Sequence, residues 1–203
     1  MKRIVINKAD IQTMNLSSLM CNIHGDYWDR FQPKAREHYR LLVNITRQFE
    51  ASNFLDLGTS HGGSAFSMAT SLEGKRPNTV VSIDIDDARF RQNKRNISLF
   101  TFPKNIIFDL RDAKKIHPEF YSNFQVIMID ITHNGEDERT IYDNICKSDF
   151  SGLLIMDDID YKHKFPKLKE YWQSIEATKF ELDYCHISGT GLIPFKGIDL
   201  VIT

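Results

Sequence analysis

Four side chains in the second half of the chain have the types and spacing for metal and proton chemistry, namely Asp130, His133, Asp157 and Asp158. Each aspartate ends or directly follows an apolar run that reads as a buried strand, so the three should meet at one edge of a sheet. Carboxylates gathered there repel one another unless they are protonated or bind a cation, and oxygen ligands suit Mg²⁺. Such an ion would bind a substrate hydroxyl and lower its pKa. His133 would then take the proton as a general base.

Three of these residues, His133, Asp157 and Asp158, also have structural interpretations that the sequence leaves open. His133 precedes Asn134-Gly135, a typical turn, and would then be a surface residue or a contact at a helix start. The Asp157-Asp158 pair would lie in a solvated loop and supply one helix N-cap. Spacing alone does not decide between these interpretations and the metal site.

A glycine-rich stretch, 54–66, predicts a ligand-binding turn. An apolar run ends at Asp56, Gly58, Gly62 and Gly63 follow, and a helical pattern comes next. A strand that turns through glycines into a helix leaves backbone N–H groups pointing outward, which suits a nucleotide-like ligand carrying a carboxylate or phosphate. The loop matches neither G-x-G-x-x-G nor G-x-x-x-x-G-K-[ST], so it carries weight only together with acidic residues elsewhere.

Acidic residues at other strand ends complete that prediction. Asp84 ends the second strand, where a carboxylate commonly accepts hydrogen bonds from the ribose hydroxyls of a nucleotide. Asp86 is the reserve candidate, although Asp86 or Asp87 would also cap the following helix. Asp112 follows the third strand and would face the same edge of the sheet.

The elements that must position these residues alternate between strand and helix. Short apolar runs predict strands at 53–57, 79–85, 105–110, 125–131 and 153–156. Helical patterns fall between and after them, near 64–72, 87–100, 116–121, 136–146 and 165–177. Strands buried on both faces and separated by helices predict a doubly wound, Rossmann-like α/β fold: a seven-stranded, mostly parallel sheet with helices on both faces.

Two further strands are expected at 180–187 and 198–203, on either side of a turn-rich loop. No helical pattern separates them, so an antiparallel hairpin at the sheet edge is predicted. Ahead of the first strand, 34–49 shows the three- and four-residue apolar spacing of an amphipathic helix.

Aromatic residues cluster in the N-terminal segment at Tyr27, Trp28, Phe31 and Tyr39. They would cover a small-molecule pocket as a lid, dock the segment on the domain, or make a subunit contact. The sequence leaves these alternatives open, and with them the question of a homo-oligomer.

Length and composition favour a single globular domain. The 203 residues, 41% hydrophobic and 26% charged, fit one domain over 1–203, with 1–50 as an N-terminal helical or lid segment and 51–203 as the α/β core. A net charge of −1 gives no electrostatic footprint for nucleic acid or an anionic membrane. No apolar run approaches the roughly 18 residues that span a bilayer. Three widely spaced cysteines, an odd number, indicate reduced thiols and a cytoplasmic location.

Five segments together resemble the class I S-adenosylmethionine-dependent methyltransferases. More narrowly, they are similar to the small metal-dependent O-methyltransferases grouped with the cephalosporin-hydroxylase-like and sugar O-methyltransferases. The expected late antiparallel strand also fits that family. The segments are FLDLGTSHGGS (54–64), VVSIDID (80–86), DLRDA (109–113), IMIDITH (127–133) and GLLIMDDI (152–159).

The resemblance implies a bound S-adenosylmethionine and assigns its contacts. Asp56 and Gly58 would shape the turn around the methionine part, and Asp84 would hold the ribose hydroxyls. Asp112 with Ala113 would contact the adenine amino group. The remaining cofactor-binding positions that it implies are Thr59, Ser60, Gly62, Ser64, Ile85 and Asp130.

The resemblance also implies a divalent metal, Mg²⁺ by preference, with Asp130, Asp157 and Asp158 as ligands. His133 stands where sugar-type enzymes carry a His and catechol-type enzymes a Lys, which favours the sugar-type branch. Asp130 and His133 would be the catalytic residues. Two features depart from the family: a single Gly152 stands where many relatives have two glycines, and the N-terminal region has no match.

The implied activity is methyl transfer to a hydroxyl of a small molecule or sugar. A nicotinamide-dependent oxidoreductase would instead need a dinucleotide-type glycine pattern, which the loop lacks. A nucleic-acid methyltransferase would carry an Asn/Asp-Pro-Pro-Tyr/Phe motif and a basic surplus, and the sequence has neither. A non-catalytic cofactor-binding accessory module would not need the acidic residues and the histidine.

Overall fold

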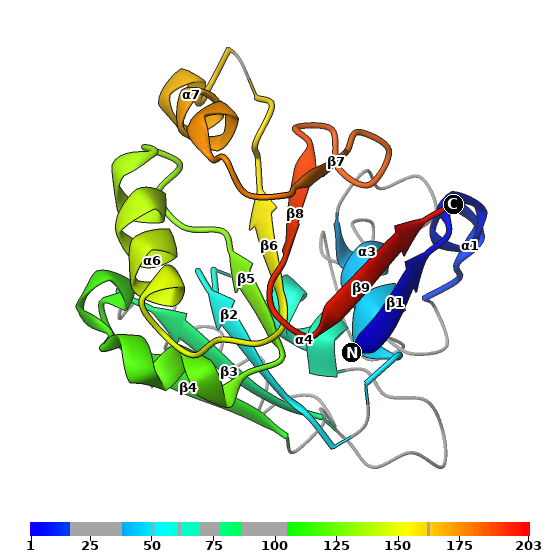
Figure 1. Ribbon diagram of the computed structural model, residues 1–203, viewed down its shortest axis with the longest axis horizontal. Helices are drawn as coiled ribbons and strands as arrows, with labels where there is room; N and C mark the ends of the chain where they lie inside the picture. Colours follow the sequence, from blue (N-terminus) through cyan, green and yellow to red (C-terminus); the bar gives the residue numbers. More distant parts are fainter. Residues whose placement is uncertain (17–37, 50, 61, 70–77, 87–104, 162) are drawn as a thin grey trace.

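A computed structural model describes residues 1–16, 38–49, 51–60, 62–69, 78–86, 105–161 and 163–203. A seven-stranded sheet runs through the molecule in the order β4-β3-β2-β5-β6-β8-β7 (Figure 1). The strand order reverses between β2 and β5. In open parallel sheets, ligands bind beyond the carboxyl ends of the strands at such a reversal.

Five neighbouring strands of this sheet are parallel, and each is a short, largely apolar run. Every residue of β5 is buried, as expected for a parallel strand covered on both faces. The doubly wound, mostly parallel sheet predicted from the sequence is therefore confirmed. The five strands are β2 (Asn53–Leu57), β3 (Thr79–Asp84), β4 (Ile106–Leu110), β5 (Val126–Ile129) and β6 (Leu153–Asp157).

The late antiparallel hairpin was predicted between the wrong two segments, 180–187 and 198–203. The antiparallel pair is β7 (Phe180–Leu182) with β8 (Thr190–Pro194), and β8 also runs antiparallel to β6. The stretch predicted to be a turn-rich loop therefore contains a strand. Gly191 lies in that strand for a packing reason, because a Cβ there would lie 2.4 Å from the Trp172 ring. β8 is the late antiparallel strand of the predicted fold class.

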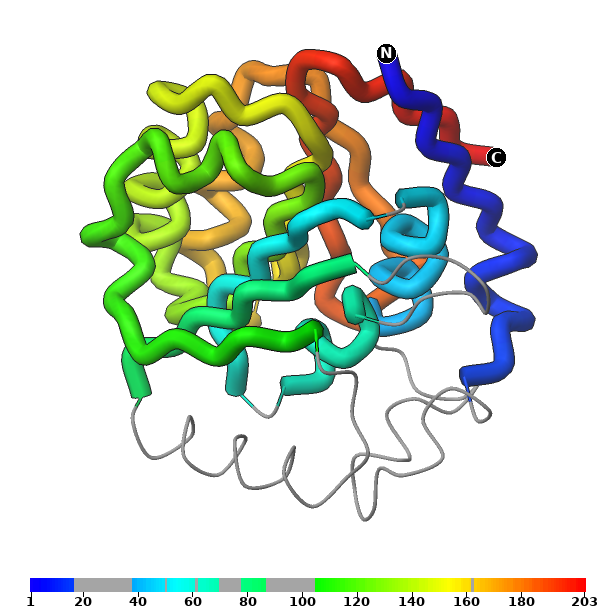
Figure 2. Tube along the Cα trace, turned by 90° about the horizontal axis from the view of Figure 1, so that it is seen from below, coloured from blue at the N-terminus to red at the C-terminus, as the bar shows by residue number. Residues whose placement is uncertain are grey.

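The last strand, β9 (Ile198–Ile202), leaves the large sheet and pairs in parallel with β1 (Lys2–Ile6). The sequence analysis did not predict β1. Ile4 and Ile6 point into the core, while the alternate residues of β1 face solvent. Figure 2 shows the two strands side by side at one edge of the molecule.

Helices cover both faces of the large sheet, as predicted. Short α1 (Lys8–Thr13) packs on α3, which lies near α4 and β1. On the other face α6 packs against α7. The helices named here are α3 (Tyr39–Thr46), α6 (Glu136–Cys146) and α7 (Pro166–Ser174). Helix α4 (Gly63–Ala69) follows the glycine turn directly.

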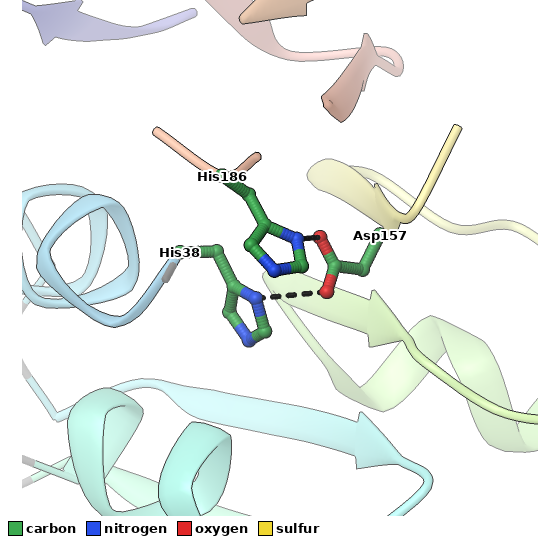
Figure 3. A group of neighbouring side chains, drawn as sticks. All are labelled: His38, Asp157 and His186. Carbon is green, nitrogen blue, oxygen red and sulfur yellow. Dashed lines mark hydrogen bonds and ion pairs between the residues drawn. The ribbon is translucent and has the colours of Figure 1, made fainter. Parts of the chain in front are cut away.

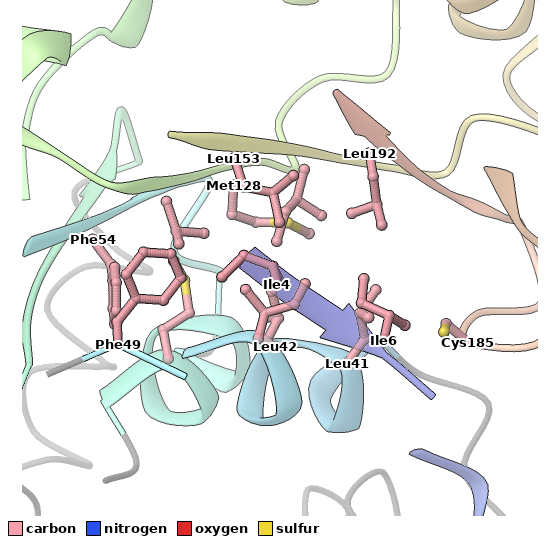
Figure 4. Packing of buried hydrophobic residues seen from close by; sticks show 14 of the residues in the cluster. Ile4, Ile6, Leu41, Leu42, Phe49, Phe54, Met128, Leu153, Cys185 and Leu192 are labelled. Atoms are coloured by element: carbon pink, nitrogen blue, oxygen red, sulfur yellow. The ribbon is translucent and has the colours of Figure 1, made fainter. Parts of the chain in front are cut away.

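Two hydrophobic cores stabilise these layers, one on each face of the sheet. In the first, Ile4 of β1 lies between Leu42 of α3 and the sheet residues Met128 and Leu153 (Figure 4). All four side chains are fully buried. Burial of an aliphatic side chain stabilises a fold by about 1.5–3 kcal/mol. The core therefore fixes α3, and the residue that precedes it, against the sheet.

Several predicted elements differ in detail or fall outside the described residues. The helix predicted at 116–121 is replaced by two 3₁₀ turns, η1 (Ala113–Lys115) and η2 (Pro118–Asn123), the second with proline in its first turn. The predicted helix 87–100 and the rings of Tyr27, Trp28 and Phe31 lie outside the described residues. Of the predicted helix 34–49, the described part forms α3. Within the described ranges, every helix is too short or too polar to cross a membrane.

Candidate cofactor and metal site

The turn after β2 is the most crowded point of the site. Gly58 has a φ of +99°, and a Cβ added there would lie 1.6 Å from the backbone oxygen of Asp130. Any other residue would therefore push the ends of β2 and β5 apart. A Cβ at Gly63 would lie 2.6 Å from the hydroxyl oxygen of Tyr39. The loop thus lies close to both β5 and α3.

A cavity of about 400 Å³, here called the Asp84 cavity, opens beside this turn. Its volume lies within the usual range for small-molecule sites. The side chain of Ile85 is 67% exposed and presents an apolar surface at its wall. The predicted cofactor-binding residues that line the cavity are Gly58, Ser60, Asp84, Ile85, Asp112, Ala113 and Asp130.

The backbone holds the Asp84 carboxylate in place. Its Oδ2 accepts the Ser60 N–H at 3.0 Å, and its Oδ1 accepts the Asp86 N–H at 2.8 Å. Because each carboxylate oxygen can accept a second hydrogen bond, Asp84 keeps the capacity to bind two hydroxyls in the cavity. Asp112 accepts the Lys114 N–H at 3.1 Å and so begins η1.

Asp56 and Gly62 support the loop and line neither cavity of the site. Asp56 is completely buried and accepts the Ser82 hydroxyl at 2.6 Å, while Ser82 and Thr59 share a further hydrogen bond. Burial raises the pKa of Asp56 to about 7, against the lowering effect of the Ser82 hydrogen bond. Gly62, with a φ of +82°, donates its N–H to the Thr59 carbonyl at 2.6 Å.

A second cavity of about 280 Å³, here called the His38 cavity, lies on the other side of the turn. Gly58, Ser60 and Asp130 line both cavities, so the two meet at the ends of β2 and β5. The predicted cofactor-binding residues Thr59 and Ser64 line the second cavity.

His133 lies between two carboxylates at this junction. Its Nε2 is 2.9 Å from Asp130 Oδ1 and 3.2 Å from Asp158 Oδ2, and its ring stacks on Phe165 with the centroids 4.4 Å apart. Burial by itself lowers the pKa of His133, but the hydrogen bond to Asp130 and the charges of both carboxylates outweigh it and raise the pKa. Burial, together with the charge of Asp157, raises the pKa of Asp158.

A tight turn before α6 aims the His133 ring. Glu138, which is buried, accepts the N–H of His133 and the N–H of Gly135, each at 2.7 Å. His133 itself has a φ of 60°, which is uncommon for a residue with a side chain. Asn134 caps α6 by accepting two backbone N–H groups at its start. The turn that offered a purely structural interpretation is real, and it directs His133 toward the acids.

Asp157 points toward two histidines that the sequence analysis missed. Its Oδ2 lies 2.9 Å from His38 Nδ1, and its Oδ1 lies 2.9 Å from His186 Nδ1 (Figure 3). His38 immediately precedes α3, and His186 lies in the turn between β7 and β8. The predicted strand 180–187 covered His186 and hid this position. Burial raises the pKa of Asp157, but the charge of His38 and the hydrogen bond of His186 outweigh burial and lower it.

The three predicted metal ligands line the same cavity but divide into two groups at ligand distance. Asp130 and Asp158 join His133, whereas Asp157 joins His38 and His186. The alternative for the Asp157-Asp158 pair, a solvated loop with one helix N-cap, does not describe Asp157, which ends β6 and is buried. Among the described residues these are the two groups of side chains that could hold a metal ion.

Backbone strain is concentrated around this site. Ser60, His133 and Asp158 all have positive φ, between 43° and 60°, although none is glycine. Such conformations cost free energy and persist where the surrounding structure enforces them, typically at functional sites. In the described chain the other non-glycine residue of this kind is Ala51, which precedes β2.

A comparison with protein families matches residues 48–191 to the model of a methyltransferase domain. The chain belongs to this methyltransferase family. The matched region holds the glycine turn, Asp84, and both candidate metal groups except for His38. A search of curated proteins finds no match to the sequence.

Solved methyltransferase structures share the fold at low sequence identity. A methyltransferase from Podospora anserina, with S-adenosylhomocysteine bound, is 11% identical, with a TM-score of 0.61 over 92% of this chain and 88% of that one. An O-methyltransferase from Bacillus cereus, also in complex with S-adenosylhomocysteine, is 16% identical, with a TM-score of 0.54 over 93% and 90%. A methyltransferase from Geobacter sulfurreducens is 13% identical, with a TM-score of 0.57 over 78% and 80%. The predicted class I methyltransferase fold is confirmed.

Proposed function

We propose that this methyltransferase moves the methyl group of S-adenosylmethionine to a hydroxyl oxygen of a small molecule or carbohydrate, with the assistance of a divalent metal. The observation that carries the proposal is the junction of the two cavities. Gly58, Ser60 and Asp130 line both, and His133 lies beside Asp130. A cofactor in the Asp84 cavity would thus meet an acceptor in the His38 cavity next to a general base.

The Asp84 cavity fits the nucleoside part of the cofactor. The carboxylate of Asp84 is oriented by two backbone N–H groups and would accept hydrogen bonds from the ribose hydroxyls. Ile85 offers an exposed apolar surface on which an adenine ring would pack, with Asp112 and Ala113 at its edge. The glycine turn leads toward the second cavity and would take the methionine part. S-adenosylmethionine supplies an already activated methyl group, so alignment of the acceptor carries much of the rate enhancement.

The acidic residues of the His38 cavity fit a divalent ion. Asp130, Asp157 and Asp158 would hold it, and Mg²⁺ is the hard cation that such oxygen ligands prefer. An ion here supplies positive charge that makes a bound hydroxyl more acidic. In the structure His133 Nε2 faces Asp130 and Asp158 and so carries a proton. With an ion held by these carboxylates, that proton would be replaced, and Nε2 would then be free to act as the general base for the hydroxyl. A vicinal diol or catechol acceptor would place two oxygens near the acids and so fix its own orientation.

The acceptor would be a small molecule or carbohydrate, with no nucleic-acid partner. We also place the enzyme in the cytoplasm, because its cysteines are odd in number and widely spaced. Cys146 and Cys185 carry free thiols in the structure.

The test begins with ligand-induced stabilisation. S-adenosylhomocysteine should raise the melting temperature and NAD should not, because a ligand that binds only the folded state stabilises it. Methyl transfer from labelled S-adenosylmethionine would then be measured on a panel of vicinal-diol sugars and catechols, with and without Mg²⁺. Stabilisation by NAD alone would overturn the cofactor assignment in favour of an oxidoreductase. Stabilisation by S-adenosylhomocysteine without transfer to any acceptor would favour an accessory module.

A further inference from the structure

The buried group formed by His38, Asp157 and His186 has no part in the function proposed above beyond its single carboxylate. The exposed fraction of the side chain is 3% for His38, 3% for Asp157 and 10% for His186. The three residues come from the start of α3, the end of β6 and the β7–β8 turn. The fold therefore gathers two imidazoles and a carboxylate from three remote segments into its interior.

The two imidazoles approach the carboxylate from different directions. Their ring centroids are 5.5 Å apart and their planes are nearly perpendicular, so the rings do not stack (Figure 3). Each turns its Nδ1 edge to a different oxygen of Asp157, at 2.9 Å. Two imidazole nitrogens and one carboxylate therefore lie together, a set of donors that suits a transition metal.

One nitrogen of the buried His38 ring is unsatisfied. Its Nδ1 is paired with Asp157 Oδ2 at 2.9 Å, whereas its Nε2 has no hydrogen-bond partner within the described ranges. A buried polar atom left without a partner costs about 1–3 kcal/mol. Buried groups of this kind call for an explanation such as a bound ion.

The spacing of the donor atoms suits a metal ion. Metal–nitrogen and metal–oxygen bonds of about 2.0–2.1 Å place the ligand atoms of a tetrahedral ion about 3.3 Å apart. The observed nitrogen–oxygen distances of 2.9 Å are somewhat shorter, so the rings would move slightly outward to admit an ion. The ligand atoms of the whole group lie within 4.8 Å of one another.

A hydroxyl group orients the carboxylate. Thr190 donates to Asp157 Oδ1 at 3.2 Å, while Ser188 lies 3.1 Å from His186 Nδ1, on the side of the ring that faces the carboxylate. Ser188 also donates to Asp158. Such partners orient metal ligands and tune their basicity.

We propose that His38, Asp157 and His186 bind a divalent transition-metal ion such as Zn²⁺, Mn²⁺ or Co²⁺. Imidazole ligands select such ions over Mg²⁺, which prefers oxygen. This site shares Asp157 with the ion proposed above but takes its two nitrogen ligands from His38 and His186, and its occupancy is measured without an acceptor or methyl transfer. The ion joins α3 to the sheet and the β7–β8 turn, so it stabilises the wall of the His38 cavity.

The experiment titrates Co²⁺ into the metal-free protein and follows the visible absorption of the bound ion. Wild type should bind Co²⁺, and its visible absorption should change. Added Zn²⁺ should abolish this absorption by displacing Co²⁺, whereas an equal concentration of Mg²⁺ should leave it unchanged. His38→Gln and His186→Gln should each weaken this binding by about 100-fold or more, since even supporting partners of metal ligands are worth 10–100-fold. His133→Gln, which changes the other group, should leave it intact.

Two controls keep the result interpretable. His117→Gln removes an imidazole whose side chain is 76% exposed, and it should bind Co²⁺ as wild type does. S-adenosylhomocysteine should stabilise every variant to the same extent, which shows that each one folds. The proposal is overturned if both His38→Gln and His186→Gln bind Co²⁺ like wild type, or if only His133→Gln loses it. Failure of S-adenosylhomocysteine to stabilise wild type would count against the proposed function and leave the metal result standing.

Discussion

The Asp84 cavity and the His38 cavity share a wall but are assembled in different ways. The Asp84 cavity is lined by residues that directly follow β2, β3, β4 and β5, which are neighbours in one parallel sheet. The His38 cavity also takes residues from the start of α3 and from the β7–β8 turn. The first is therefore built mainly at the carboxyl edge of the sheet, with Asp137 of α6 and two residues of η1 added. The second depends on how a helix and a hairpin dock on it.

The two cavities therefore position their side chains in different ways. In the Asp84 cavity, backbone N–H groups do much of the positioning, and Asp84 is oriented by two of them. In the His38 cavity, side chains position one another, as Asp157 does with two histidines. We expect substitutions in the shared wall to affect both cavities and substitutions beyond it to affect one.

The largest effect is expected from Gly58→Ala, in the shared wall. The new Cβ would meet the Asp130 carbonyl and force a positive φ on alanine, so the loss of stability should exceed about 4 kcal/mol. Urea unfolding measures it. Gly62→Ala is the matched control, because its Cβ would lie 3.1 Å from the Phe66 ring, and it should cost only about 1–3 kcal/mol. Equal losses in the two variants would show that the wall is not specially crowded.

The second effect concerns pH and Asp56, which lies beneath the loop. Its pKa is raised to about 7 in the folded state, above the unfolded value, so its contribution to stability is fully present below pH 4. That contribution is lost as the pH rises to about 7, by about 4 kcal/mol in total. Asp56→Asn should remove this part of the pH dependence, measured by urea unfolding between pH 4 and pH 8. Parallel stability curves for the two proteins would contradict the burial argument.

The third prediction tests the junction itself. His133→Gln should lower methyl-transfer turnover by about 100-fold or more, because a general base is lost. Calorimetric affinity for S-adenosylhomocysteine should stay within about twofold, since the Asp84 cavity keeps its carboxylate. His163→Gln, at an exposed position, is the control. Full turnover in His133→Gln would remove the base from the mechanism and leave the fold assignment untouched.

The smallest effect is expected within the Asp84 cavity. Asp84→Asn should weaken S-adenosylhomocysteine about tenfold or more, because hydrogen bonds to a charged group contribute about 1.5–3 kcal/mol. Asp86→Asn, two residues along, should change the affinity little. Calorimetric titration measures the affinity of each variant for S-adenosylhomocysteine. A larger loss in Asp86→Asn would transfer the ribose contact to the residue named as the reserve.

The two cavities were also unequally predictable from the sequence. Asp84, Asp112 and Asp130 follow short apolar runs, and the geometry of parallel strands brings such ends together. His38 and His186 are single histidines without a motif, 148 positions apart in number, and only tertiary packing makes them neighbours. No local pattern distinguishes them from surface residues.

Two strands escaped prediction for related reasons. β8 contains Gly191 and lies among turn-forming residues, and the benefit of that glycine becomes visible only beside the Trp172 ring. β1 is a five-residue strand with charges at its start, and its partner β9 is far away in the sequence, with Lys2 opposite Ile198. For Asp56 the sequence predicted the position but not the burial. The residue was expected to shape the turn around the cofactor, and the structure buries it completely below the loop.

The parallel pairing of β1 with β9 also sets an order of events during synthesis. Asn7 and Thr203, which hydrogen-bond beside these strands, are 196 positions apart. At about 5–20 residues per second, β1 leaves the ribosome roughly 10–40 seconds before its partner exists. Throughout that interval Ile4 and Ile6 have no strand beside them to complete their side of the core. A nascent chain therefore holds β1 without its backbone hydrogen-bonding partner for most of its translation.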